Sequence, residues 1–158
     1  PKEGSSRVIT QFLGQIARGE PIKLVDGGEQ RRSFTYVDDG IAALIKIIAN
    51  VNGVTTGKIY NIGNPRNNLS VRELAVRMLE LAAEYPEYRD NAAKVKLIET
   101  TSLDYYGKGY QDVQQRVPKI ANTCVDLDWE PMIKMDDALR RIFEAYRTHV
   151  AEAGYLVD

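Results

Sequence analysis

The chain has 158 residues, of which 44% are hydrophobic and 27% are charged, and its formal net charge is -1. This composition predicts one globular domain with a hydrophobic core. A nearly neutral chain has no overall field that would attract nucleic acid, so an anion site must come from locally placed Arg and Lys. The single cysteine, Cys124, excludes an internal disulfide, and with only one histidine it leaves little for a metal site such as zinc.

The sequence also gives expectations about where the protein is located in the cell and whether it is part of a longer chain. It contains no apolar run of about 18 residues and no basic leader followed by an apolar stretch. We therefore expect a cytoplasmic protein without membrane insertion. The polar start, PKEGSS, is typical of a segment from within a longer protein. Residues 1–158 are accordingly predicted to be a single lobe of a larger enzyme.

In chain order, the first predicted element is a helix that Ser5 or Ser6 caps and Gly19 ends. Its apolar residues recur at helical spacing: Val8, Ile9, Phe12, Leu13, Ile16 and Ala17. Residues 22–25 and 32–36 are β-prone and are joined through Asp26-Gly27-Gly28. They are predicted to form a hairpin-like pair.

A second helix is predicted with Asp38 and Asp39 in its first turn, where carboxylates complement the helix dipole. Its apolar residues are expected to form a buried stripe: Ile41, Ala42, Leu44, Ile45 and Ile48. A strand over residues 58–63 follows. Ser70 and Glu73 then form a capping box, which predicts the start of a third helix.

The C-terminal half is predicted to contain a strand over 95–99 and a long loop over about 100–117. A loop of this length indicates a functional role. A short helix is predicted from Pro118, and a last helix from about Asp136 to His149, with Trp129 anchoring the turn between them. Helices that alternate with short strands, without an internal repeat, predict one α/β unit.

Two basic stretches are candidates for an anion site. The first contains cations around glycines, which permit a tight reversal with exposed backbone N–H groups. Its residues are Lys23, Leu24, Val25, Asp26, Gly27, Gly28, Glu29, Gln30, Arg31 and Arg32. A guanidinium suits bidentate phosphate contacts, but neighbouring residues of an extended segment point to opposite faces, so only one arginine would face a given ligand. A solvated hairpin edge is the alternative interpretation.

The second stretch is GKGYQDVQQRVP, residues 107–118. Three tyrosines in or just before this stretch can stack on a uracil or a ribose: Tyr105, Tyr106 and Tyr110. Gly107 and Gly109 let the backbone approach a ligand closely. Arg116 lies in a constrained, extended position. The alternative is a surface loop whose aromatic residues pack on the core. Arg7, placed in the first turn of the first helix, can add to the phosphate-binding donors there or be merely exposed.

Other residues favour structural roles. Cys124 is predicted to be a small buried hydrophobe, and His149 a helix-terminal residue without catalytic function. No Gly-rich phosphate loop follows a strand, and no Tyr-x-x-x-Lys pair occurs. The chain therefore lacks the usual means of holding a dinucleotide.

Several segments together resemble the C-terminal, substrate-binding part of the extended short-chain dehydrogenase/reductase family: RSFTYVDDGIAAL, KIYNIGNP and LDWEP. GSSRVITQ, PIKLVDGGEQRRSFT and YYGKGYQDVQQRVP are similar to its ArnA-type UDP-glucuronic acid decarboxylases of lipid A aminoarabinose modification. Val117 stands where those sequences carry Lys, and Asp128 stands at the family's glycine position. The resemblance implies a substrate-binding lobe of helices and short strands, with the Rossmann lobe mostly absent.

The resemblance also implies roles. Residues 23–32, Tyr110 and Arg7 would bind UDP-glucuronic acid, and Arg116 would act as proton donor. NAD, held mainly by the absent lobe, would oxidise C4; loss of CO2 and protonation at C5 would give a UDP-4-keto-pentose. Because a guanidinium is a poor general acid in ordinary surroundings, Arg116 is expected to stabilise the carboxylate and enolate and to protonate directly or through a water.

The full-length enzyme is expected to be a homo-oligomer, and this chain alone is expected to be inactive. Two alternatives stay open. One is a nucleotide-sugar epimerase or UDP-xylose-forming decarboxylase of the same family. The other is a non-catalytic binding or assembly module.

Overall fold

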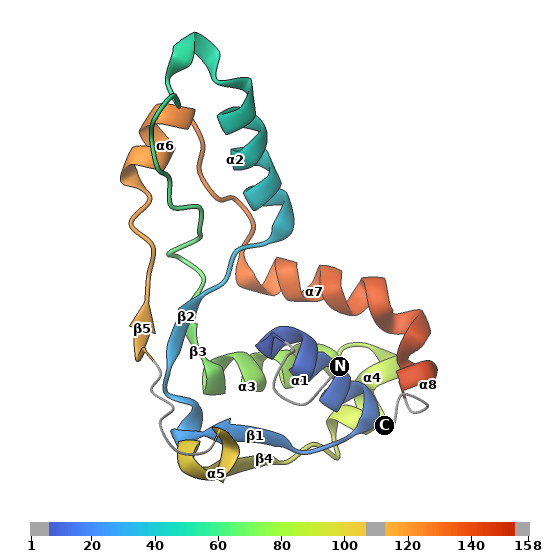
Figure 1. Cartoon of the computed structure of the whole chain (residues 1–158). Coiled ribbons are helices and arrows are strands. Elements are labelled where there is room, and N and C mark those ends of the chain that lie inside the picture. The colour runs from blue at the N-terminus through green and yellow to red at the C-terminus, as the bar shows by residue number, and fades with distance from the viewer. Residues whose placement is uncertain (1–6, 107–112, 154–158) are drawn as a thin grey trace.

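In the computed structural model, residues 7–106 and 113–153 are described. Figure 1 shows a broad end built mainly of helices and a narrow end formed by α2, α6 and the chain between them. The predicted α/β class, with helices and short strands, is confirmed. The elements are α1 (Val8–Arg18), β1 (Ile22–Val25), η1 (Asp26–Gly28), β2 (Arg31–Ser33), α2 (Val37–Ala49), η2 (Val51–Gly53), β3 (Asn68–Ser70), α3 (Val71–Ala82), α4 (Pro86–Ala92), β4 (Leu97–Thr100), α5 (Ser102–Tyr106), β5 (Gln115–Arg116), α6 (Ala121–Leu127), α7 (Met135–Tyr146), η3 (Arg147–His149) and α8 (Val150–Ala153).

The strands form two small sheets. β1 pairs in parallel with β4, whereas β2 lies between β3, to which it is antiparallel, and β5, to which it is parallel. The predicted hairpin between 22–25 and 32–36 is therefore wrong. Asp26, Gly27 and Gly28 have φ values of 48°, 76° and 71°. These left-handed residues form η1, which carries the chain out of the first sheet and into the second.

The main core lies between the helices of the broad end and β1. The first helix is confirmed, with Phe12, Ile16 and Ala17 buried, but its N-cap is Arg7, which makes no side-chain cap bond. The predicted caps Ser5 and Ser6 lie outside the described residues. The core also buries residues of four further elements: Leu24, Leu74, Met78, Tyr88, Leu139 and Phe143.

The capping box of α3 is confirmed. The Ser70 hydroxyl accepts a hydrogen bond from the Glu73 backbone N–H at 3.0 Å, and the Glu73 carboxylate accepts one from the Ser70 N–H at 2.8 Å. These two bonds satisfy donors that a helix N-terminus would otherwise leave unpaired.

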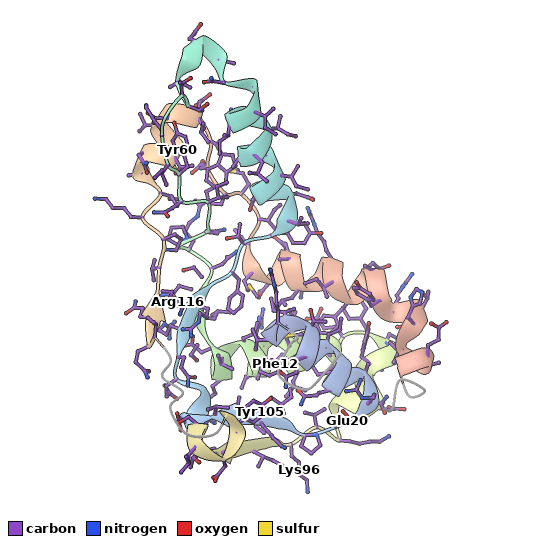
Figure 2. The ribbon with its side chains drawn as sticks, viewed as in Figure 1. Phe12, Glu20, Tyr60, Lys96, Tyr105 and Arg116 are labelled. Carbon is purple, nitrogen blue, oxygen red and sulfur yellow. The ribbon has the colours of Figure 1, made fainter. Side chains whose placement is uncertain are left out.

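A second, smaller core lies at the narrow end. It contains Ala43, Leu127 and Trp129, with Tyr60, Ile62 and other residues packed against it. The predicted anchoring role of Trp129 is confirmed, since its indole N–H donates to the Asp39 carbonyl at 3.1 Å. Figure 2 shows Tyr60 between α2 and α6.

The predicted buried stripe of α2 is wrong. Ile41, Leu44, Ile45 and Ile48 are between 47% and 81% exposed, and Ala42 is exposed as well. The buried residues of this helix are Asp39 and Ala43. The Asp39 carboxylate accepts hydrogen bonds from the backbone N–H groups of residues 132 and 133, both at 3.0 Å, and so turns that face of α2 inward.

Residues 58–63 are not a strand, contrary to the prediction. They are extended and lie beside residues 118–123, and side chains make the contacts between the two segments: the Asn61 amide donates to the Lys119 carbonyl, and the Thr123 hydroxyl to the Asn61 carbonyl. Gly63 has no room for a side chain, because an added Cβ would lie 2.4 Å from Cγ of Pro118.

The C-terminal half departs from the predictions in three places. The strand predicted over 95–99 is confirmed as β4, but the predicted loop over 100–117 contains α5 and β5. The short helix begins at Ala121 and ends at Leu127, and its C-cap Asp128 has a φ of 43°, a conformation that favours glycine, the residue expected from the family. The last long helix ends at Tyr146, and His149 lies in η3. Among the described residues, every helix is too short or too polar to span a bilayer.

Candidate functional site

The loop η1, between β1 and β2, is held on both sides. The Gln30 amide donates to the Val25 carbonyl at 3.2 Å, and the Arg72 Nε donates to the Gly27 carbonyl at 2.8 Å. At Gly28 an added Cβ would lie 3.0 Å from the Arg72 backbone nitrogen, and φ is positive. The loop therefore needs glycine at this position, and it fixes where β2 begins.

The register of the second sheet sorts the two arginines of β2 onto opposite faces. Arg32 pairs with Leu69 on one side and with Arg116 on the other, whereas Arg31 pairs with Ser70 and Gln115. Paired residues of neighbouring strands project to the same face of a sheet. The prediction that only one of these arginines would face a given ligand agrees with this arrangement.

Arg31 is held by a carboxylate. Its guanidinium contacts Glu73 at 3.0 Å and donates to the Asn68 carbonyl at 2.8 Å. The Ser70 backbone N–H and, secondarily, Arg31 lower the pKa of Glu73, because both stabilise its charged form. Arg31 thus joins β2 to the start of α3.

Arg32 and Arg116 form the opposite face, and we call this pair the arginine row. The Arg32 Nη1 donates to the Arg31 carbonyl at 2.8 Å and to the Val113 carbonyl at 2.7 Å, so its guanidinium is oriented by backbone oxygens. Arg116 is exposed on β5, where Figure 2 labels it. The Arg116 guanidinium has no hydrogen-bond or ion-pair partner among residues 7–106 and 113–153. Two arginines that project from the same face of a sheet at paired positions can bind an anion such as phosphate or carboxylate.

The other predicted ligand residues of the first basic stretch lie in different environments, some exposed and some in the core. Lys23 is exposed on β1, and Leu24 is fully buried in the main core. The Asp26 carboxylate accepts a hydrogen bond from the Ser102 backbone N–H at 2.9 Å, which ties η1 to α5. Glu29 lies 3.7 Å from Arg72.

The remaining candidates do not add to the arginine row. Arg7 is exposed at the start of α1, and no contact recorded for the described part of the chain joins it to that row. Tyr110, Gly107 and Gly109 lie outside the described residues. The Tyr105 hydroxyl accepts a hydrogen bond from the Gln11 amide at 2.9 Å, so this tyrosine joins α5 to α1.

The sequence interpretation missed the neighbours of the arginine row, Leu69 and Val113. The capping box marks the start of α3, but nothing in the sequence indicates that the residues just before it pair with β2. In the described part of the chain, no group of three or more His, Cys, Asp or Glu side chains could hold a metal ion. Cys124 is half-buried against the second core, close to its predicted role.

Comparisons with known proteins agree with this fold. Residues 1–63 match the model of the NAD dependent epimerase/dehydratase family. The PbgP3 protein from Burkholderia pseudomallei is 66% identical over 100% of this chain, which spans 43% of that protein, with a TM-score of 0.83. The UDP-glucose 4-epimerase from Thermotoga maritima, solved with UDP-glucose, is 23% identical (94% of this chain, 41% of that one, TM-score 0.68).

A UDP-glucuronic acid 4-epimerase from Bacillus cereus, in complex with UDP-glucuronic acid and NAD, is 18% identical (96% of this chain, 42% of that one, TM-score 0.69). At such identities the two epimerases support the fold alone. The chain spans less than half the length of each of these three proteins.

Proposed function

We propose that this chain, whose first 63 residues match the NAD dependent epimerase/dehydratase family, is the sugar-nucleotide-binding lobe of an ArnA-type UDP-glucuronic acid decarboxylase. The observation that carries the proposal is the arginine row, in which Arg32 and Arg116 share one face of the sheet beside η1. A UDP-sugar acid offers two groups to such a pair, a diphosphate and a carboxylate.

The roles divide by geometry. Arg32, oriented by two backbone carbonyls, is assigned to the diphosphate. Arg116, at the outer strand, is assigned to the sugar carboxylate. As CO2 leaves, its charge stabilises the enolate that forms, and it supplies the proton at C5 directly or through a water. Arg31 is assigned no ligand contact, because it is paired with Glu73 on the other face.

NAD does not fit this chain by itself. The sequence contains neither a Gly-rich phosphate loop after a strand nor a Tyr-x-x-x-Lys pair. Oxidation at C4 is therefore assigned to the part of the enzyme that this chain does not contain, and the chain alone is expected to be inactive. The resemblance adds four further parts to the proposal. They are a UDP-4-keto-pentose product, a role in the aminoarabinose pathway, a homo-oligomeric enzyme and a cytoplasmic location.

Calorimetric titration of the chain with UDP and with UDP-glucuronic acid tests the assignment. Arg32→Ala should weaken binding of both ligands at least about tenfold, because a charge-assisted hydrogen bond contributes about 1.5 to 3 kcal/mol. Arg31→Ala removes the same charge from the adjacent residue and should leave both affinities unchanged. Arg116→Met should weaken only UDP-glucuronic acid. Equal effects of Arg31→Ala and Arg32→Ala would contradict the assignment.

In the complete enzyme, Arg116→Met should keep UDP binding and suppress release of CO2. Wild-type turnover by that variant would remove Arg116 from the mechanism. Binding of UDP-glucuronic acid without release of CO2 by the unaltered complete enzyme would favour an epimerase instead.

A further inference from the structure

The loop η1 has a backbone conformation that contacts with other parts of the chain must hold. Asp26, Gly27 and Gly28 follow one another with positive φ, and the first of them is not a glycine. A non-glycine residue in this region is strained, so it persists only where its surroundings fix it. β2 begins three residues after the loop, at Arg31. A change in the loop would therefore move the start of that strand.

Arg72, in the first turn of α3, joins this loop to a strand of the other sheet. Its Nε donates to the Gly27 carbonyl at 2.8 Å, and its Nη2 forms an ion pair with the Glu99 carboxylate on β4. The Glu29 carboxylate lies 3.7 Å from the same Nε. A planar guanidinium bound at two of its nitrogens has a fixed orientation. Arg72 therefore places the Gly27 carbonyl relative to both α3 and β4.

The loop and α3 also meet through their backbones. A Cβ added at Gly28 would lie 3.0 Å from the Arg72 backbone nitrogen, so the two backbones are in close contact. The Val71 backbone N–H donates to the Gln30 carbonyl at 3.1 Å. The residues between the loop and β2 are thus held against the start of α3. A displacement at Gly27 has little free chain in which to be absorbed before β2.

β2 in turn determines where Arg32 lies. The Arg31 backbone N–H donates to the Gln114 carbonyl at 2.8 Å, and the Arg32 Nη1 donates to the Val113 carbonyl at 2.7 Å. Both bonds cross to β5 or the residues just before it, and they accompany the register that pairs Arg32 with Arg116. Figure 1 shows β2 leading from the end of β1 toward β3 and β5. The arginine row therefore depends on where the loop delivers β2.

We propose that Arg72 is a positioning residue for the anion site: it fixes η1 and, through the loop, the register in which Arg32 pairs with Arg116. Arg72 is assigned no contact with the nucleotide, because its guanidinium already binds the Gly27 carbonyl and Glu99. This inference rests on the proposed function, since it takes the arginine row to be the site that binds the diphosphate.

Hydrogen exchange of the chain without nucleotide tests the link from Arg72 to β2. Arg72→Ala should make the Arg31 backbone N–H, which bonds across to β5, exchange at least about tenfold faster relative to that of Met78 in the main core. Arg77→Ala is the matched control, because Arg77 lies on the same helix but pairs with Asp136 of α7. It should leave this ratio unchanged. An unchanged ratio in Arg72→Ala overturns the proposal.

Calorimetric titration with UDP tests the consequence for binding. Arg72→Ala should weaken binding about three- to tenfold, as expected for the loss of one hydrogen bond, and Arg77→Ala should leave it unchanged. In a chain that already carries Arg32→Ala, Arg72→Ala should have no further effect, because it acts through Arg32. Arg72→Lys keeps the charge but not the planar fork, so it should recover only part of the affinity.

The outcomes separate this inference from the proposed function. An additive loss in the Arg32→Ala background overturns the positioning role, because Arg72 would then act independently of Arg32. Full affinity in Arg72→Lys overturns it as well, since the charge alone would suffice. If Arg32→Ala weakens UDP binding and Arg72→Ala does not, the positioning role alone is wrong. If neither variant affects UDP binding, the proposed function fails and this inference fails with it.

Discussion

Two adjacent carboxylates at the start of α2 should differ sharply in what they contribute to stability. Asp39 is buried, and its carboxylate accepts hydrogen bonds from the backbone N–H groups of Met132 and Ile133, both at 3.0 Å. Asp38 is exposed and forms an ion pair with Arg141 at 3.2 Å. Both lie in the first turn, so their favourable interaction with the helix dipole is similar, about 0.3 to 1 kcal/mol.

The magnitudes follow from these partners. Each hydrogen bond to a charged group contributes about 1.5 to 3 kcal/mol, so Asp39→Ala should lower the free energy of unfolding by roughly 3 kcal/mol or more. An exposed ion pair contributes about 0 to 1 kcal/mol, which sets the expected loss for Asp38→Ala. The two variants delete the same charge one residue apart, so the difference between them isolates burial and hydrogen bonding.

Urea denaturation, followed by the fluorescence of the nearby Trp129, measures both losses. With a denaturant slope of about 1 to 3 kcal/mol per molar, Asp39→Ala should lower the midpoint by about 1 M or more, and Asp38→Ala should change it little. Equal midpoints for the two variants would show that the 132–133 turn does not depend on Asp39. The reasoning from the hydrogen bonds would then be wrong.

Two further predictions concern packing and pH. Gly63→Ala should lower the free energy of unfolding by about 1 to 3 kcal/mol, because the added Cβ would lie 2.4 Å from Pro118. Gly40→Ala, with no atom within 4 Å of the added Cβ, should raise it by up to about 1 kcal/mol. Melting temperatures that shift equally in the two variants, or in the opposite directions, would contradict this. Burial raises the pKa of Tyr88 to about 12, so its contribution to stability is complete below about pH 10 and is lost as pH rises toward 12. Stability should therefore fall over that range, and Tyr88→Phe should flatten the slope; an unchanged slope in the variant would count against the burial argument.

Local signals in the sequence predicted much of the secondary structure. The capping box placed α3, the periodic apolar residues of α1 placed that helix, and Trp129 was assigned its anchoring position. The capping box and the helical repeat depend on residues within a few positions of one another, whereas the Trp129 anchor bonds to Asp39, 90 residues away. Hydrogen bonds between near neighbours and the helical repeat require no knowledge of distant parts of the chain.

The wrong predictions concern elements whose structure depends on contacts with residues distant in sequence. Residues 22–25 and 32–36 looked like a hairpin because they are close in the chain, yet β1 pairs with β4, whose residues lie 75 positions further along the chain. The apolar residues predicted to form a buried stripe on α2 looked like a core face: Ile41, Ala42, Leu44, Ile45 and Ile48. Instead, the backbone N–H groups of residues 132 and 133 draw Asp39 inward and leave these residues exposed.

The candidate site divides in the same way. Composition and spacing identified Arg32 and Arg116 as cations suited to an anionic ligand, because charge and guanidinium geometry are properties of the side chains themselves. Only the folded chain decided that these two arginines share a face while Arg31 turns to Glu73, since that follows from strand register across more than eighty residues. Register depends on which strands meet, and that is set by the packing of the whole molecule.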